Sequence, residues 1–237
     1  MTTPRTDIII SLHATRERPA ETYFQKCVSD LEQYTKNYRL VLVEDGCDDV
    51  ARGVIEDTAR KHQAVLIHSG KRRWFTRAYN LGLRMARTSR VVVLNADIEL
   101  GQGWLEELYA VWEEAEKTEG RVGLVGDVHS DPEPRRWAAS HQPDYVTGHC
   151  WLVSMQAISE ASAARGQPGI YLDETKASNI HIRSDVEICW EMNQLGWATI
   201  KAFKAPVGHH GGKSWGHLLG TIPGDIRDVD YEYENQE

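Results

Sequence analysis

Short apolar runs alternate with segments of helical periodicity along the first half of the chain. The apolar runs predict buried β-strands at Asp7–Leu12, Arg39–Glu44, Ala64–Ile67 and Arg90–Asn95. The segments between them predict helices over about Ala20–Lys36, Asp49–His62 and Trp74–Ala86. This β-α-β-α order predicts an α/β fold with a mainly parallel sheet that helices cover on both faces. Such sheets bind their ligands at the carboxyl ends of the strands.

The second half continues with further helices and strands and then becomes glycine-rich and acidic. The expected elements are a helix over about Trp104–Glu119, strands at Val122–Gly126, in "YVTGHCWLVS" and in "ATIKAF", a short helix to about Ala164 and a helix at Asp185–Leu195. Gly196 follows that last helix and suits a left-handed C-cap. Residues 224–237 form an acidic tail poor in aliphatic side chains, which predicts mobility.

Composition narrows the class of protein. With 237 residues, 41% of them hydrophobic and 26% charged, the chain can bury a full core. A net charge of −8 argues weakly against general nucleic-acid binding. The four cysteines show no C-x-x-C spacing, so we expect neither a zinc knuckle nor a disulfide framework, and a cytoplasmic location. No apolar run approaches the roughly 20 residues of a membrane span, and we expect no signal peptide.

Two acids follow the buried strand in "VVVLNADIEL". Asp97 and Glu99 lie just beyond its carboxyl end, and in an extended segment both side chains can point the same way. Two converging carboxylates repel each other unless a cation lies between them. Hard oxygen ligands suit Mg²⁺ or Mn²⁺, and these ions suit diphosphates. The alternative is a simple turn, because Asn and Asp often leave a strand by bonding their own backbone.

A second acidic strand end stands in "LVEDGCDD". A carboxylate at such a place can accept hydrogen bonds from ribose hydroxyls or a base N–H. Asp48 or Asp49 can instead cap the helix that follows. Both readings hold together if Glu44 and Asp45 face a ligand while one of the later two acids caps the helix.

Local positive charge is concentrated in "GKRRWFTRAYNLG". Arg73, Arg77 and Asn80 recur at helical spacing and share one face, which suits an anionic ligand. A solvated helix face explains the same charges equally well.

The segment "RSDVEICWEMNQLG" opens a helix. Ser184 and Glu187 have the spacing of a capping box. Asp185 has no capping duty there and is a candidate general base, which the helix N-terminus would keep ionised. An acid that only complements the helix dipole is the alternative.

A pair of histidines precedes the glycine-rich loop "HHGGKSWG". His209 or His210 can complete a metal site, and Lys213 can meet phosphate oxygens. A histidine pair alone is weak evidence for either role.

In order, these segments resemble the inverting nucleotide-sugar glycosyltransferases of the GT-A fold, family 2, especially rhamnosyltransferase-like enzymes. The matching features are the opening strand and loop Ile8–Thr15, the acidic "VEDGCDD", Ala78, Asn80 and Gly82 of an Ala-x-Asn-x-Gly helix, Asn95, Asp97 and Glu99 of an Asn-x-Asp-x-Glu motif, "TGHCWLVS", "YLDE", the acid-initiated helix and the His-His-Gly-Gly loop. The resemblance covers about residues 7–216. It implies a Rossmann-like single domain over residues 1–223, with a nucleotide-binding half at about 1–100 and an acceptor-binding half at about 101–223.

The resemblance also implies a role for each matching residue. Asp185 would be the catalytic base. The residues expected at the Mn²⁺ or Mg²⁺ ion are Asp97, Glu99, His209 and His210. Those expected at the nucleotide-sugar donor are His13, Thr15, Glu44, Asp45, Arg77, Asn80, Asn95, Ala96 and Lys213. Those expected near the acceptor are His149, Trp151, Trp190 and Trp215.

Three positions depart from the family pattern. Ser184 stands where the family usually has Glu, Glu187 where a second Asp is usual, and Trp190 where Arg is frequent. These departures put the acceptor in doubt more than the reaction, because Asp185 is kept.

Other enzyme classes fit less well. A dinucleotide-dependent dehydrogenase needs glycines after its first strand, and "SLHATRERPA" has none. A zinc hydrolase would need thiol or clustered histidine ligands at zinc spacing, and the sequence has none. The remaining alternative is a non-catalytic nucleotide- or sugar-binding module of the same fold. The sequence leaves open the donor, whether the sugar is a hexose or a pentose, the oligomeric state, and whether the acceptor is a glycan, a small molecule, a protein or modified DNA.

Overall fold

A seven-stranded sheet forms the centre of the described part of the chain, which comprises residues 5–16, 19–127, 146–174 and 184–210 of a computed structural model. The strands lie side by side in the order β3 (Val65–His68), β2 (Tyr38–Glu44), β1 (Thr6–Leu12), β4 (Arg90–Asn95), β7 (Cys150–Ser154), β6 (Val122–Asp127) and β8 (Ala198–Ala202). Every strand expected from an apolar run is present, with ends within a few residues of the prediction.

All strands of this sheet except β7 run in one direction. β1 pairs in parallel with β2 and β4, β2 with β3, and β6 with β8, whereas β7 is antiparallel to both β4 and β6. The prediction of a mainly parallel sheet is confirmed. One edge of the sheet therefore collects the carboxyl ends of β1, β2, β4 and β6 together with the beginning of β7.

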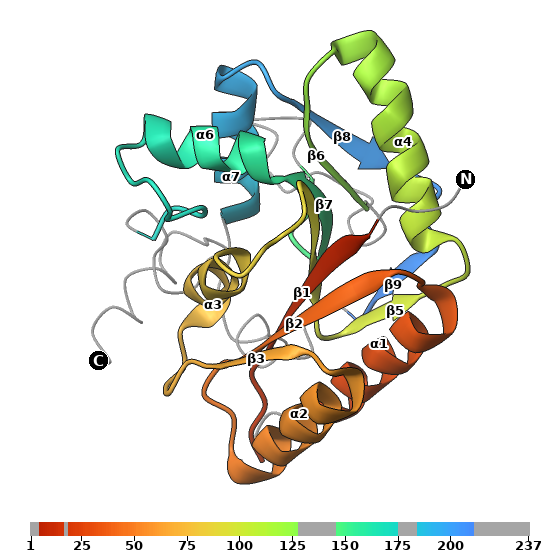
Figure 1. Ribbon diagram of the computed structural model, residues 1–237, viewed down its shortest axis with the longest axis vertical. Coiled ribbons are helices and arrows are strands. Elements are labelled where there is room, and N and C mark those ends of the chain that lie inside the picture. The colour runs from red at the N-terminus through yellow and green to blue at the C-terminus, as the bar shows by residue number, and fades with distance from the viewer. Residues whose placement is uncertain (1–4, 17–18, 128–145, 175–183, 211–237) are drawn as a thin grey trace, which may run out of the picture.

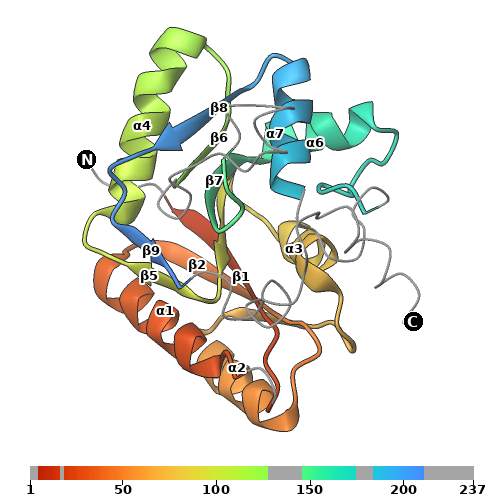
Figure 2. The same ribbon diagram turned by 180° about the vertical axis from the view of Figure 1, so that it is seen from behind.

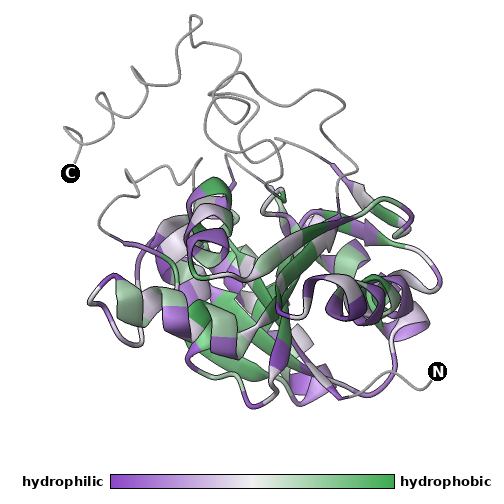
Figure 3. Ribbon diagram, turned by 90° about the horizontal axis from the view of Figure 1, so that it is seen from above, coloured by the Kyte–Doolittle hydropathy of each residue, from purple (hydrophilic) through white to green (hydrophobic). Residues whose placement is uncertain are grey.

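Helices cover both faces of the sheet (Figures 1 and 2). The helices α1 (Glu21–Tyr34), α2 (Asp49–His62) and α4 (Trp104–Glu119) pack on one face, and α3 (Trp74–Leu83), α6 (Met155–Ala164) and α7 (Ser184–Gln194) on the other. Successive strand residues alternate between the two layers, so that Ile8 and Ile10 meet α1 while Ile9 meets α3. Figure 3 shows the hydrophobic colour concentrated on the strands between the helices.

A second, two-stranded sheet was not predicted. β5 (Ile98–Leu100) pairs antiparallel with β9 (Val207–His209), and Ile98 lies opposite His209. Three-residue strands are too short to show a period of two in the sequence, which explains the omission. This small sheet brings the segment after β4 into contact with His209 and His210, at the end of the described chain.

A buried ion pair lies at the other end of the strands, where β1 and β2 begin. The guanidinium of Arg39 donates to the Asp7 carboxylate at 2.7 and 2.8 Å, and the N–H groups of Arg87 and Thr88 donate to the same carboxylate. Burial raises the pKa of Asp7, but these partners outweigh it and leave the pKa below its usual value. This pair stabilises the strand beginnings, far from the strand ends that face the candidate site.

Helix ends agree with the sequence where a cap residue marks them. The Asp48 side chain accepts from the N–H of Ala51 and caps α2, and Gly196 takes a left-handed φ of 76° after α7. Within the residues that the structure describes, no helix has the length and apolar character to cross a bilayer.

Candidate functional site

A pocket opens at the carboxyl ends of β1, β2 and β4, where a parallel sheet places its ligand. Its wall comes from the end of β1, the start of α1, the loop after β2, the start of α3 and the turn after β4. The lining residues are Ser11, Leu12, His13, Pro19, Ala20, Tyr23, Asp45, Arg72, Trp74, Phe75, Tyr79, Asn95, Ala96 and Asp97. Of the residues expected at the donor, His13, Asp45, Asn95 and Ala96 line this pocket.

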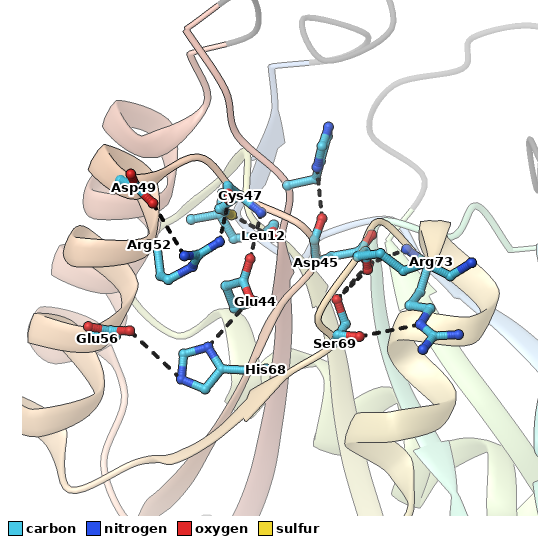
Figure 4. A network of polar contacts seen from close by, with 12 residues as sticks. Leu12, Glu44, Asp45, Cys47, Asp49, Arg52, Glu56, His68, Ser69 and Arg73 are labelled. Carbon is cyan, nitrogen blue, oxygen red and sulfur yellow. Dashed lines mark hydrogen bonds and ion pairs between the residues drawn. The ribbon is translucent and has the colours of Figure 1, made fainter.

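Asp45 uses its carboxylate to hold the start of α3. It accepts the N–H of Arg73 at 2.5 Å and that of Trp74 at 3.0 Å, as seen in Figure 4 for Arg73. Trp74 takes a φ of 65°, a left-handed conformation that is rare for a bulky residue and occurs where the surrounding structure enforces it. Burial raises the pKa of Asp45 to about 6, against the opposing effect of the two N–H groups.

Glu44 also serves the loop after β2. Its carboxylate accepts the N–H of Cys47 at 2.5 Å and lies 3.4 Å from Nδ1 of His68 (Figure 4). The side chain is buried and is not part of the pocket wall. Glu44 therefore shapes the loop that carries Asp45.

Aromatic side chains form much of the pocket wall, and the sequence reasoning did not assign them. The guanidinium of Arg72 lies 3.4 Å from the centroid of the Trp74 ring, and the Phe75 and Tyr79 rings are in contact with each other. Tyr79 donates to the carbonyl of Leu94 at 2.7 Å. Flat rings beside a cation and a carboxylate suit a nucleoside.

The four residues expected at the metal form two separate pairs. Asp97, in the turn after β4, lies 3.2 Å from Nε2 of His209, and Glu99 lies 2.8 Å from Nε2 of His210. The first pair is mostly buried, whereas Glu99 is half exposed and the His210 ring leans on Tyr23. Each acid faces a different histidine, and among the described residues the four side chains do not gather into one metal-holding group.

Behind the Asp97–His209 pair lies a second carboxylate–imidazole pair. His149 Nε2 is 3.0 Å from the carboxylate of Asp127, and both side chains are buried. The rings of His149 and His209 stack with centroids 4.7 Å apart and planes 8° from parallel. Burial raises the pKa of Asp97, but the hydrogen bond and charge of His209 outweigh it and leave the pKa below its usual value. Burial lowers the pKa of His149.

The Asp97–His209 pair fits a divalent cation. A carboxylate oxygen and an imidazole nitrogen are acceptable ligands for Mn²⁺, and Mg²⁺ and Mn²⁺ commonly combine one or two protein ligands with substrate phosphates. Among the described residues, no three His, Cys, Asp or Glu side chains form a metal-holding group. The pair therefore suits an ion that completes its shell with diphosphate oxygens and water, and does not suit a closed structural site.

Asp185 lies at the start of α7 and contacts the turn that precedes β7 and carries His149. Its carboxylate accepts the N–H of Gly148 at 3.2 Å and that of Val186 at 2.9 Å. His149 in turn accepts the N–H of Asn95 through its carbonyl at 2.9 Å. The beginning of β7 thus connects the candidate base with the strand end that precedes Asp97.

The sequence profile of glycosyl transferase family 2 matches residues 8–160, more than half of the chain. The chain belongs to glycosyl transferase family 2. Its structure resembles that of the mannosyltransferase PcManGT from Pyrobaculum calidifontis, solved in complex with GDP-Man and Mn²⁺, with a TM-score of 0.59 at 16% identity over 84% of this chain and 55% of that one. It also resembles TarS 1-349 from S. aureus, with a TM-score of 0.59 at 12% identity over 91% of this chain and 63% of that one.

These likenesses establish the GT-A fold of this family 2 protein. The chain spans less than two thirds of the length of either solved structure. No curated protein has a sequence that matches it significantly.

Several residues expected at the donor lie elsewhere in this family 2 protein. The Asn80 side-chain amide is buried on α3. It donates to the carbonyl of Leu172 and accepts the N–H of the same residue, which tethers the "YLDE" segment. Arg77 lies 3.9 Å from Glu174, and neither it nor Thr15 is part of the pocket wall. Lys213 lies outside the described residues, as do the acidic tail and the expected domain end at 223.

The residues expected near the acceptor are spread over different environments. Trp151 is 1% exposed and packs in the core against Phe75, whereas Trp190 on α7 is 46% exposed. His149 is buried behind His209, and Trp215 lies outside the described residues.

Asp127 is the functional-site residue that sequence reasoning missed most directly. It ends β6, at the same edge of the sheet as the ends of β2 and β4. The rule that identified Asp45 and Asp97, an acid at the end of a parallel strand, applies equally to Asp127.

Proposed function

We propose that this family 2 protein is a metal-dependent, inverting glycosyltransferase that moves a sugar from a nucleotide-sugar donor to an acceptor hydroxyl. One observation carries the proposal: three features meet where the parallel strands end. They are an aromatic pocket, the Asp97–His209 pair at its rim and the Asp185 carboxylate, which accepts the N–H of Gly148 before β7. PcManGT, which shares the fold, was solved with GDP-Man and Mn²⁺.

The pocket would hold the nucleoside of the donor. His13, whose Nδ1 lies 2.7 Å from the carbonyl of Asp45, and Asp45 itself offer polar groups. Tyr23 and Trp74 offer ring faces on the same wall. A few fixed polar groups among apolar surfaces are typical of small-molecule sites.

Asp97 and His209 would hold the divalent cation at the rim of the pocket. When bound, the cation neutralises the charge that develops on the departing diphosphate. Glu99 and His210 form a more exposed pair beside it and would influence the ion through charge alone. We place Lys213 near the same diphosphate as a proposal from the sequence.

Asp185 would act as the general base. It removes the proton of the acceptor hydroxyl while that oxygen attacks the anomeric carbon from the face opposite the nucleotide, which inverts the configuration. The N–H groups of Gly148 and Val186 fix the carboxylate and favour its ionised form, which a base needs.

The identities of the sugar and acceptor remain proposals at the level of class. A hexose or pentose donor, a rhamnosyltransferase-like specificity, a cytoplasmic location and acceptor contacts at Trp190 are predictions from the sequence resemblance. A glycan, a small molecule, a protein and modified DNA are the acceptor classes to be compared.

Calorimetry with UDP, GDP and dTDP, each with and without Mn²⁺, tests the proposed donor site. We expect one diphosphate to bind, and to bind more tightly with Mn²⁺. Equal binding of all three with and without Mn²⁺, or no binding at all, contradicts the proposal. Release of sugar from the corresponding donor then separates an enzyme from a non-catalytic binding module, because only the enzyme turns the donor over.

A further inference from the structure

A buried pair that the proposed mechanism does not use lies directly behind the candidate metal ligands. The side chains of Asp127 and His149 are 2% and 4% exposed, and they face each other at 3.0 Å. Withdrawing a carboxylate and an imidazole from water costs free energy that their mutual bond only partly returns. A polar pair in this position therefore calls for a reason other than stability.

The pair is locked to the site by the backbone as well. The hydroxyl of Thr147 donates to the carbonyl of Asp127 at 3.1 Å, which ties β6 to the segment that leads into β7. The carbonyl of His149 accepts the N–H of Asn95, two residues before Asp97. His149 is thus fixed to the same strand end that carries the proposed metal-binding carboxylate.

His209 needs such support because its own element is small. It is the last residue of β9, a three-residue strand that, among the described residues, pairs with the three-residue β5 alone. Its ring lies almost parallel to that of His149, at 4.7 Å between centroids, and in this orientation Nε2 is 3.2 Å from Asp97. The neighbouring His210 ring meets Tyr23 at 45°, and within the described part of the chain no parallel ring stacks on it.

We infer that Asp127 and His149 are positioning residues that hold the imidazole of His209 by stacking, so that His209 and not His210 joins Asp97 at the divalent cation. This inference rests on the proposed function. The hydrogen bond from His149 to Asp127 fixes the orientation of the His149 ring, and the stacked His209 ring takes the same orientation. Groups that orient a metal-binding histidine normally affect metal affinity about 10–100-fold when they are lost.

Two substitutions of His149 separate the stacking from the hydrogen bond. His149→Gln keeps a donor for Asp127 but removes the flat ring, whereas His149→Phe keeps the ring and removes the imidazole bond to the buried Asp127. Loss of a hydrogen bond to a buried carboxylate is destabilising, so His149→Phe will unfold more easily than His149→Gln. Affinity for Mn²⁺ alone, measured from the electron paramagnetic resonance of the free ion, will rank in the opposite order. We expect about a tenfold loss in His149→Gln and a smaller loss in His149→Phe.

Asp7→Asn serves as the matched control, because it breaks a buried ion pair of similar burial at the far edge of the sheet. It should lower the melting temperature and leave the Mn²⁺ affinity unchanged. If His149→Gln binds Mn²⁺ as the wild type does, or if the affinity losses simply follow the losses of stability, the positioning role is overturned.

A readout without metal distinguishes failure of this inference from failure of the proposed function. In a carbon–proton NMR spectrum of the imidazoles, stacking shifts the His209 ring proton, and that shift should persist in His149→Phe and disappear in His149→Gln. A wild type that shows this shift but binds no Mn²⁺ contradicts the proposed metal dependence and the role in metal binding, while leaving the stacking intact. A wild type that binds Mn²⁺ without the shift contradicts the positioning role alone.

Discussion

Two strands of this family 2 protein are followed by closely spaced acids at the same end of the sheet, and the two sets of acids have different partners. Glu44, the last residue of β2, and Asp45 accept hydrogen bonds from backbone N–H groups of the loops around them, and Glu44 also faces His68 at the end of the neighbouring strand β3 (Figure 4). Asp97 and Glu99, after β4, face histidine side chains that come from a distant part of the sequence. The sequence patterns at the two strand ends look alike.

The two kinds of carboxylate differ in the free energy that is lost when their present hydrogen bonds are broken. A carboxylate that satisfies buried N–H groups is part of the fold, since removing it leaves those donors unpaired. A carboxylate beside an imidazole nitrogen offers two lone-pair donors to one point, which a cation can occupy. We therefore expect substitutions after β2 to act mainly on stability and those after β4 mainly on metal binding.

The largest expected effect concerns Asp185, the proposed base, which is linked to the end of β4 through the turn before β7. Asp185→Asn keeps an oxygen for the N–H of Gly148 but cannot take a proton from the acceptor. We expect turnover to fall by about 10²–10⁴-fold, the usual contribution of a general base, with donor affinity nearly unchanged. Single-turnover kinetics with the donor found by calorimetry measure both quantities. Glu187→Gln, in the same helix, is the control and should retain turnover; full activity in Asp185→Asn removes Asp185 as the base.

Asp97→Ala tests the metal-binding side directly. Since loss of an outer partner of a metal ligand already costs 10–100-fold, we expect the loss of a ligand to weaken Mn²⁺ binding by more than about 100-fold. The free energy of unfolding should fall by about 1–2 kcal/mol, because one mostly buried hydrogen bond to His209 is lost. Calorimetry and urea unfolding provide the two measurements. Glu99→Ala is the matched control and should bind Mn²⁺ within a few-fold of wild type; equal losses in both variants contradict the separation into two pairs.

Much of the fold followed from local sequence patterns. Apolar runs of four to seven residues predicted the strands, Asp48 predicted the cap of α2, and Gly196 predicted the left-handed end of α7. Each of these features depends on residues that are neighbours in the sequence, so a periodicity or a cap preference is enough to find them.

The site was predictable only as a set of residue types. The sequence placed Asp97 and His209 at one metal, yet it could not separate them from Glu99 and His210, because the histidine that each acid faces depends on contacts between segments far apart in the sequence. It assigned Asp45 to the ligand without its N–H partners, whose direction depends on the unusual φ of Trp74. Long-range pairing and backbone exceptions of this kind have no local signature.

Removal of the Asp45 side chain tests the structural half of the comparison. Asp45→Ala leaves the N–H groups of Arg73 and Trp74 without their acceptor, and each buried donor costs about 1–3 kcal/mol, so we expect a loss of about 3–4 kcal/mol. Asp45→Asn retains one acceptor oxygen and should lose less than half of that. Urea unfolding at pH 7 measures both variants. A loss in Asp45→Ala no larger than that in Asp97→Ala would erase the contrast between the two strand ends.

The pH dependence of stability gives the smallest and most specific test of Asp45. Its pKa is about 6 in the folded protein and near 3.8 when unfolded, because burial favours the neutral form. Between these values the folded state retains a proton that the unfolded state has released, so the contribution of Asp45 to stability falls as the pH rises from about 4 to 6. The full change is about 2–3 kcal/mol, at roughly 1.4 kcal/mol for each pKa unit. Other acids titrate in the same range, but they are common to wild type and Asp45→Asn, so the difference between the two unfolding curves isolates this carboxyl. Curves that stay parallel from pH 4 to 7 would mean that the N–H groups of Arg73 and Trp74 keep Asp45 ionised in spite of burial, and Asp45 would then resemble Asp97 in charge while still differing from it in its partners.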